Sequence, residues 1–312
     1  MIGAVVIGRN EGQRLIDCLM SLRGQVQQLV YVDSGSTDGS AAAASDLGAQ
    51  VVDLDLSRPF TAARARNAGL NALGKDCSLV QFVDGDCIVD TNWINTASAF
   101  LAEHPDVAVV CGRRRERFPE ASIYNQLCND EWNTPVGVAK ACGGDALMRV
   151  APLRDVGGYR EDLIAGEEPE LCVRLRASGW RIWRLDAEMA LHDAQMLRFA
   201  QWWTRARRAG YAFAEGATLH GAPPERHWVA ETRRALLWGF GLPLAIALAS
   251  LLACGMLLAL LVYPLQVLRL SQRMGWAGAF FSVLGKFPEA LGALEFHWHR
   301  TTGKKRGLIE YK

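Results

Sequence analysis

The chain has 312 residues, half of them hydrophobic and 21% charged, and its 34 Lys and Arg residues balance 33 Asp and Glu residues to a net charge of +1. This composition excludes a disordered tail and an acidic solvating protein. It also excludes a strongly basic nucleic-acid-binding protein, so no nucleic acid is expected as a partner. The length accommodates one large α/β domain and an additional segment.

Apolar runs alternate with segments of helical periodicity in the first part of the chain. The predicted strands are residues 2–8, 29–32, 49–52 and 79–83, and the predicted helices between them are residues 15–22, 40–47 and 62–73. This alternation indicates a mostly parallel sheet covered on both faces, whose ligands collect beyond the carboxyl ends of the strands. The chain has neither a G-x-G-x-x-G fingerprint after the first strand nor a P-loop.

The pattern is weaker after Val107. A polar stretch covers residues 113–133 and contains the basic run 113–117, which we expect to contact an acceptor, an anionic lipid or solvent. Beyond it we predict a strand entry at 143–148, a helix at 170–178, and two strands at 181–185 and 189–192.

Two carboxylates, Asp84 and Asp86, follow the predicted strand at 79–83 with one glycine between them. Oxygen ligands of this kind suit Mg²⁺ or Mn²⁺ bridging a diphosphate. The same three residues also form an ordinary solvated Asp-Gly turn, so the motif alone does not establish a metal site.

Five segments in order resemble the family 2 glycosyltransferases of the GT-A fold, over about the first 200 residues. They are residues 5–11 (VVIGRNE), 32–40 (VDSGSTDGS), 65–69 (ARNAG), 84–86 (DGD) and 166–175 (GEEPELCVRL). The resemblance implies a Rossmann-like mixed α/β sheet with helices on both faces. It also implies inverting transfer of a sugar from a nucleotide-sugar to an acceptor hydroxyl or phosphate, with Mg²⁺ or Mn²⁺ as cofactor.

The resemblance also implies roles for individual residues. The implied donor-binding residues are Arg9, Asn10, Glu11, Asp33, Arg66 and Asp84. Asp33 would contact the base or ribose and Arg66 a phosphate, while the implied metal ligands are Asp86, Asp84 and His192. Three simpler interpretations stay open: self-capping turns at Asp33 and Asp38, a structural Arg66-Asn67 pair, and an ordinary hydrogen-bonded His192.

Inverting transfer needs a carboxylate that accepts the proton of the acceptor. The family usually has Glu-Asp there, whereas this chain has Glu167-Glu168, and Glu170 replaces a later Asp. We predict Glu168 as the catalytic base, with Glu167 and a purely capping acidic cluster as the alternatives. Pro169 suits a first helical turn and predicts Glu168 at the N-cap, where burial would have to raise its pKa.

A Trp- and Arg-rich segment, residues 201–208, follows the predicted domain. It resembles a motif that some membrane glycosyltransferases place over the donor diphosphate, which implies donor contacts for Arg205 and Arg208. The same residues also suit a helix at a membrane surface.

Residues 235–268 are 34 consecutive uncharged residues, too many for one straight crossing of a hydrocarbon core of roughly 30 Å. Pro243, Gly255 and Pro264 are candidate bends, with Gly255 as the turn between two helices. Because basic residues occur on both sides of the segment, both flanks are expected on the cytoplasmic face, which favours a hairpin. The alternative is a buried hairpin or an oligomer interface.

Residues 276–296 are apolar but carry charges, and they are predicted to lie at the membrane interface. The basic residues 304–306 are expected in the cytoplasm. Eight scattered cysteines indicate buried thiols in a reducing compartment, and the first residues do not have the pattern of a signal peptide. We therefore expect a protein of the cytoplasmic membrane whose catalytic domain lies on the cytoplasmic side.

The predicted organisation is a GT-A domain at 1–200, an amphipathic connection at 201–234 and a membrane-associated part at 235–312. The predicted function is transfer from a nucleotide-sugar to a lipid-linked saccharide or polysaccharide. Two alternatives are a polyprenyl-phosphate sugar synthase and a membrane-tethered protein that binds nucleotide-sugar without turnover. The sequence does not specify the sugar, the nucleotide, the acceptor or the oligomeric state.

Overall fold

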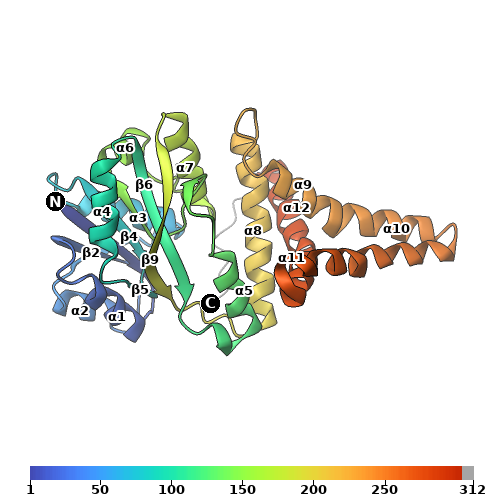
Figure 1. The fold of residues 1–312 in the computed structure, drawn as a ribbon, viewed down its shortest axis with the longest axis horizontal. Helices are drawn as coiled ribbons and strands as arrows, with labels where there is room; N and C mark the ends of the chain where they lie inside the picture. The colour runs from blue at the N-terminus through green and yellow to red at the C-terminus, as the bar shows by residue number, and fades with distance from the viewer. Residues whose placement is uncertain (304–312) are drawn as a thin grey trace. The chain divides into compact units, whose positions relative to one another are not determined.

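The computed structural model describes residues 1–303, apart from the side chain of Cys254, so the basic residues 304–306 lie outside the described residues. The chain divides into two compact units, Met1–Gln195 and Met196–Lys312. The first unit contains a nine-stranded sheet with helices on both faces, and the second unit is helical (Figure 1).

The strands of unit 1 are β1 (Ile2–Gly8), β2 (Gln28–Asp33), β3 (Gln50–Asp53), β4 (Leu79–Asp84), β5 (Cys87–Val89), β6 (Val107–Glu116), β7 (Gly137–Ala139), β8 (Ala146–Arg149) and β9 (Arg181–His192). Its helices are α1 (Gln13–Leu22), α2 (Ser40–Asp46), α3 (Ala62–Ala72), α4 (Trp93–Glu103), η1 (Pro119–Ala121), α5 (Ile123–Glu131), α6 (Val150–Asp155) and α7 (Glu167–Ala177). The strand order is β3-β2-β1-β4-β8-β6-β9-β5, and β7 pairs with β9.

The sheet is mixed. Strands β1 to β4 pair in parallel, as do β6 and β9, whereas β8 runs antiparallel to both β4 and β6. Parallel pairing therefore covers the first four strands and the β6–β9 pair, and the mixed sheet implied by the family resemblance is confirmed. The two strands predicted at 181–185 and 189–192 form one continuous strand, β9. This strand is long enough to pair with β5, β6 and β7.

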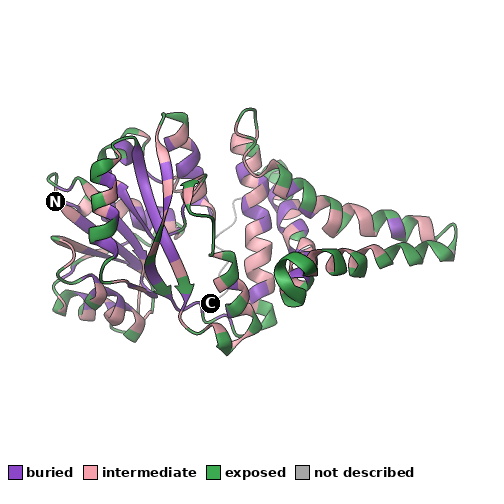
Figure 2. Ribbon diagram, in the orientation of Figure 1, coloured by how far each residue is buried: buried purple, intermediate pink, exposed green. Residues whose placement is uncertain are grey.

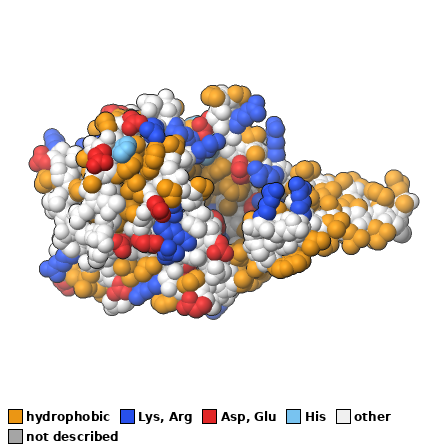
Figure 3. Space-filling view, in the orientation of Figure 1, with side chains coloured by type: hydrophobic (Ala, Val, Ile, Leu, Met, Phe, Trp, Pro, Cys, Tyr) orange, Lys and Arg blue, Asp and Glu red, His pale blue; other side chains and the backbone are white. Residues whose placement is uncertain are grey.

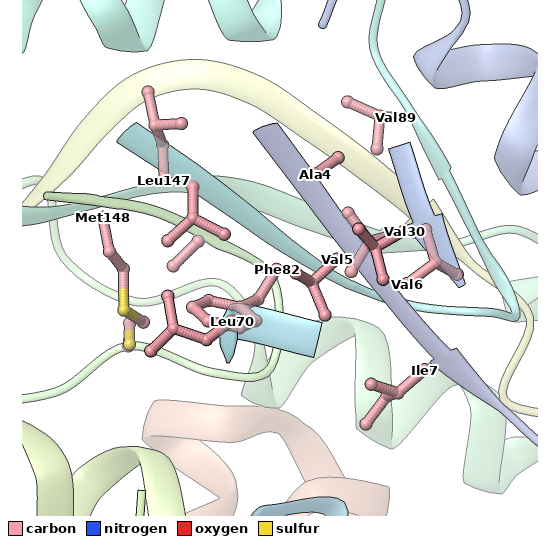
Figure 4. Packing of buried hydrophobic residues seen from close by; sticks show 14 of the residues in the cluster. Ala4, Val5, Val6, Ile7, Val30, Leu70, Phe82, Val89, Leu147 and Met148 are labelled. Carbon is pink, nitrogen blue, oxygen red and sulfur yellow. The ribbon is translucent and has the colours of Figure 1, made fainter. Parts of the chain in front are cut away.

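The core of unit 1 lies on the sheet (Figures 2 and 4). Apolar side chains from β1, β2, β4 and β8 are buried against one another, including Val5, Val30, Phe82 and Leu147. Helix α3 packs against β1 and β2, and a methyl group at Gly69 would overlap the side chain of Val5. This close contact brings α3 and its Arg66 down onto the sheet, beside the ends of the central strands.

The helices of unit 2 are α8 (Phe199–His220), α9 (Val229–Leu236), the π-helix η2 (Leu237–Gly241), α10 (Leu242–Ser250), the 3-10 helix η3 (Cys254–Leu261), α11 (Val262–Leu284) and α12 (Lys286–Thr302). Helices α8 and α12 approach backbone to backbone. A methyl group at Gly210 would overlap the main chain of Glu289, and one at Gly292 would overlap the main chain of Arg207.

Within unit 2, α10 and η3 lie side by side, and the chain reverses at residues 251–253, just before the predicted turn at Gly255 (Figure 1). The two arms carry many exposed apolar side chains, of which Leu251 and Leu252 at the turn are 81% and 92% exposed (Figure 3). The segment Gly255–Thr302 is long and apolar enough to cross a membrane, by length and composition only.

Candidate active site

The Asp84-Gly85-Asp86 turn lies at the ends of β4 and β1. The Gly85 amide donates to the Ile7 carbonyl at 2.8 Å, and a methyl group at Gly85 would lie only 3.1 Å from that oxygen. A larger residue would push the turn away from β1. The Asp84 side chain is 29% exposed, whereas Asp86 is buried.

Arg66 of α3 is buried and joins three carboxylates. Its Nη2 donates to Asp84 Oδ1 at 2.9 Å. Its Nη1 lies 2.8 Å from Glu167 Oε1 and 2.9 Å from Glu168 Oε1. In the structure Arg66 links the Asp-Gly-Asp turn to the start of α7, and its implied contact with a donor phosphate stays a prediction. One guanidinium shared by three carboxylates also leaves this position with net negative charge.

Glu168 lies in the first turn of α7, with 14% of its side chain exposed. Burial, followed by the negative charge of Glu167, raises the pKa of the Glu168 carboxyl to about 7, against the opposing effect of Arg66. The predicted N-cap position was wrong: Gly166 is the N-cap, with φ of 80°, and the helix begins at Glu167. A glycine adopts this left-handed conformation without steric cost, which allows the helix to start earlier than Pro169 indicated.

Asp86 and His192 come together from β5 and β9, which pair at this point. His192 Nε2 lies 3.4 Å from Asp86 Oδ1, and Cys87 Sγ belongs to the same close group of ligand atoms. Burial raises the pKa of the Cys87 thiol well above its usual value, so the sulfur stays protonated and donates to Asp145 Oδ2 at 3.3 Å. Asp84, also predicted as a ligand, is outside this group and accepts a hydrogen bond from Arg66, and its contact with a metal stays a prediction.

The pair formed by Asp86 and His192 fits a hard divalent cation. The buried Nδ1 of His192 has no hydrogen-bond partner among the described residues, and Glu116 Oε2 lies 3.8 Å from it. A proton on Nδ1 would face Glu116 and leave the lone pair of Nε2 toward Asp86. A lone pair facing a carboxylate is favourable only with a cation between them, and one ion at about 2.1 Å from each atom suits the observed spacing.

Three neighbours of this site lie in the polar stretch 113–133, which the sequence associated with acceptor contacts and not with a metal site. Glu116 is buried and accepts from the Ala194 amide at 3.1 Å, which fixes its carboxylate beside His192. The Arg114 guanidinium lies 3.2 Å from Asp145 Oδ2 and 4.5 Å from the Trp132 ring. Trp132 in turn meets His192 edge to face at 4.7 Å. Their only signal in the sequence was a polar run within a predicted α/β domain.

The residues predicted to bind the donor base lie in two loops that hydrogen-bond to each other. Asn10 Oδ1 accepts from the Thr37 amide at 2.7 Å, and the Asn10 amide donates to Ser36 Oγ at 2.9 Å. Arg9 is exposed, and Glu11 pairs with Arg14 at 2.6 Å.

Asp33 lies buried at the end of β2. Its Oδ2 accepts from the amides of Gly35 and Ser36, and its Oδ1 accepts from the Tyr31 hydroxyl at 2.9 Å. The self-capping turn is therefore present, as it is at Asp38, which accepts from the Ser40 amide. Each Asp33 oxygen retains acceptor capacity, so a contact with the donor stays a prediction.

Arg205 and Arg208 lie on α8, in unit 2, and both are half-buried. Their predicted contact with a donor diphosphate stays a prediction.

Comparison with known proteins agrees with the fold and the order of motifs. The family model "Glycosyl transferase family 2" matches residues 4–150. The pre-mycofactocin glycosyltransferase of Mycobacterium tuberculosis is 27% identical over 233 residues, which cover 70% of this chain and 48% of that protein. The succinoglycan biosynthesis protein ExoA of Rhizobium meliloti is 26% identical over 193 residues, covering 57% of this chain and 58% of that protein.

Solved structures are similar over most of the chain. The mannosyltransferase PcManGT of Pyrobaculum calidifontis, in complex with GDP-Man and Mn²⁺, matches with a TM-score of 0.67 at 20% identity, over 94% of this chain and 86% of that one. TarS of S. aureus in complex with UDP-GlcNAc matches with a TM-score of 0.54 at 15% identity, over 96% and 92%. The chain spans about half the length of the pre-mycofactocin glycosyltransferase. Its fold is GT-A, and its residues 4–150 match the family 2 glycosyltransferases.

Proposed function

We propose that this protein is a metal-dependent inverting glycosyltransferase that moves a sugar from a nucleotide-sugar to a lipid-linked saccharide or a polysaccharide. One observation carries the proposal: the buried Arg66 guanidinium bonds both Asp84 and Glu168. This arrangement puts a carboxylate of elevated pKa beside the turn at which family 2 enzymes hold their donor. A base and the proposed donor site thus lie close to each other, as inverting transfer requires.

In this proposal Glu168 acts as the base. Its carboxylate takes the proton of an acceptor hydroxyl while that oxygen bonds the anomeric carbon and the bond from this carbon to the diphosphate breaks. Arg66 holds Glu168 and Asp84 at a fixed separation. Asp86 and His192 would hold Mn²⁺ or Mg²⁺, which when bound neutralises charge on the leaving diphosphate.

The acceptor and the membrane belong to the same proposal. The exposed apolar side chains on the two arms of unit 2 support binding of this unit to a lipid bilayer. The basic residues on both flanks of the segment favour the cytoplasmic face; they are Arg233, Arg234, Arg269 and Arg273. A relative named for succinoglycan biosynthesis and another that acts on pre-mycofactocin indicate how widely acceptors differ within this family. The raised pKa of Glu168 favours a hydroxyl acceptor over a polyprenyl phosphate, which needs little deprotonation.

The test measures donor binding and transfer on the same purified full-length protein. Melting temperatures are recorded with UDP, GDP, TDP and CMP, each with and without Mn²⁺, because a ligand that binds the native state raises the melting temperature by mass action. We expect one nucleotide to stabilise the protein only with metal, and we expect Asp86→Asn to lose that response while Glu168→Gln keeps it.

Transfer of a labelled sugar to a membrane lipid extract then separates the alternatives. A monophosphate-linked product would identify a polyprenyl-phosphate acceptor. Metal-dependent nucleotide binding without turnover for any donor would replace the enzyme with a nucleotide-sugar-binding protein, and the absence of any nucleotide response would reject the proposal.

A further inference from the structure

A second cluster of arginines lies apart from the carboxylates of the candidate active site. Along β6, Arg114 faces Asp145, whereas its neighbours Arg113 and Arg115 line a separate pocket of about 320 Å³. The partner strand β9 contributes Arg184, Asp186 and Glu188 to the same pocket, and the loop after α5 contributes Asn133 and Thr134. The basic run 113–117 is therefore divided between two sites.

Two of these arginines are buried without a matching anion. Arg113 and Arg184 are 6% and 3% exposed. Within residues 1–303, the buried Nη1 of Arg113 and the buried Nε of Arg184 have no hydrogen-bond partner. The hydrogen bonds that these side chains do make go to neutral oxygens. Arg113 donates to the main-chain carbonyl of Asn129 at 3.1 Å, and Arg184 donates to that of Leu185 at 3.5 Å.

The pocket lining has three arginines and two carboxylates, Asp186 and Glu188, so it carries a net positive charge. Among the described residues, Asp186 forms no ion pair with Arg113 or Arg184. Arg115 is neutralised by Glu188, through bonds of 2.7 and 2.6 Å. Burial, together with the positive charges of Arg115 and Arg184, lowers the pKa of Arg113. A buried guanidinium that lacks a paired charge is costly to the folded protein, since its desolvation is not compensated. Two such groups facing one pocket indicate that a mobile anion supplies the missing charge.

We infer that this pocket binds an oxyanion, a phosphate or carboxylate group, through Arg113 and Arg184. The planar guanidinium presents parallel N–H donors that match the oxygens of either group, and Asn133 and Thr134 add polar contacts at the wall. The oxyanion belongs either to an anionic group carried by the acceptor or to a free anion of the solution. The inference does not depend on the proposed function, because it assigns no role to Asp86 or Glu168.

The test uses inorganic phosphate and full-length protein without divalent metal, at ionic strength matched with NaCl. We expect phosphate to raise the melting temperature of the native protein by mass action, and we expect Arg184→Met and Arg113→Met to abolish this rise. Two control variants should keep it. Arg181→Gln removes an arginine from the same strand that is paired with Asp106 at 2.8 Å, and Asp86→Asn disables the candidate metal site.

An equal phosphate response in both methionine variants, or no response in the native protein, would overturn the assignment. If only Asp86→Asn loses the response, phosphate binds at the candidate metal site, and the assignment of the arginine pocket is rejected. Decyl phosphate distinguishes the sources: if it stabilises the native protein more than inorganic phosphate does, and only with Arg184 present, the anion is carried by a lipid. Stabilisation by inorganic phosphate alone assigns a free anion.

Discussion

Arg66 is the residue on which the candidate site depends, because its guanidinium connects the helix α3, the Asp84 turn and the start of α7. Sequence reasoning assigned it to the donor, since an arginine in a phosphate-binding fold is most simply placed on phosphate. Its burial was not readable from the chain, because three carboxylates distant in sequence compensate its charge only after folding.

Replacing Glu168 by Gln should abolish most transfer. The amide keeps the shape and the contact with Arg66 but cannot accept a proton, and general-base catalysis contributes typically about 10²–10⁴-fold. Initial rates of sugar transfer measure the effect, with Glu103→Gln on the exposed side of α4 as the matched control. Transfer at the native rate in Glu168→Gln would show that another group accepts the proton.

The pH dependence of transfer should follow Glu168. The base acts only when ionised, so kcat should fall as the pH decreases through about 7, the pKa to which burial and Glu167 raise this carboxyl. A rate profile from pH 5 to pH 9 measures it. An unchanged kcat between pH 5 and pH 8 would contradict the assignment.

The same titration has a signature in stability. Because the pKa of Glu168 is higher in the folded than in the unfolded state, the folded protein binds more protons between the ordinary value near 4.5 and about 7. The free energy of unfolding should therefore fall as the pH rises through that interval. In Glu168→Gln this part of the pH dependence should be missing. Urea unfolding at several pH values, followed by a spectroscopic signal from unit 1, measures the free energy of unfolding.

Glu116 should act on the metal through His192. Glu116→Gln removes the carboxylate that lies 3.8 Å from Nδ1, and loss of such a partner costs about 10–100-fold in metal affinity. Titration of Mn²⁺ by electron paramagnetic resonance measures the affinity directly. An unaltered Mn²⁺ affinity, compared with Glu103→Gln, would separate Glu116 from the metal.

Among the elements, those with strong periodicity were predicted well, whereas β6, which carries Arg114 and Glu116, was not. Strands β1 to β4 and helices α1 to α3 were expected within one or two residues at most ends, because buried parallel strands are continuous apolar runs. Strand β6 (Val107–Glu116) was not predicted. Its second half, Arg113 to Glu116, is charged and does not have the pattern of a buried strand. Those side chains find partners in tertiary structure, which local propensity does not register.

The glycine of the Ala65–Gly69 motif has a packing role at the level of the element. Gly69→Ala would press a methyl group into Val5 and Val32 of the buried strands, and overpacking of this kind costs about 1–3 kcal/mol. Urea unfolding measures the loss. Gly278→Ala is the control, because that helical glycine faces only the flexible Met274 side chain, and there alanine should be neutral or stabilising by about 0.5–1 kcal/mol.

For the whole molecule, composition predicted a folded chain with an apolar addition. The second unit contains that addition in a form that the sequence specified only in part. The turn lies at residues 251–253 instead of at Gly255, and α11 contains a non-helical residue, Gly275, with φ of 72°. The arrangement of α8 to α12 depends on contacts between helices, which a hydropathy pattern does not encode.

Membrane association should depend on the tip of the α10–η3 hairpin. Leu252→Asp places a charge at the most exposed apolar position of the turn, and a charged residue deep in a bilayer costs about 2.5–3.5 kcal/mol on insertion scales. Flotation with liposomes containing anionic lipid should show a reduced bound fraction. Met20→Asp, an exposed apolar residue on α1, should float like the native protein; equal flotation of both variants would exclude the hairpin as the anchor.

The reciprocal glycines of α8 and α12 have a consequence for mutational tolerance. At Gly210 and Gly292 the neighbour is main chain, which cannot rotate away as a side chain does, so even alanine forces the two helices apart. In a deep mutational scan selected for folded protein, these two positions should therefore retain glycine only, although neither contacts substrate in the proposed function. Invariance at such positions would record the spacing of two helices and would say nothing about catalysis.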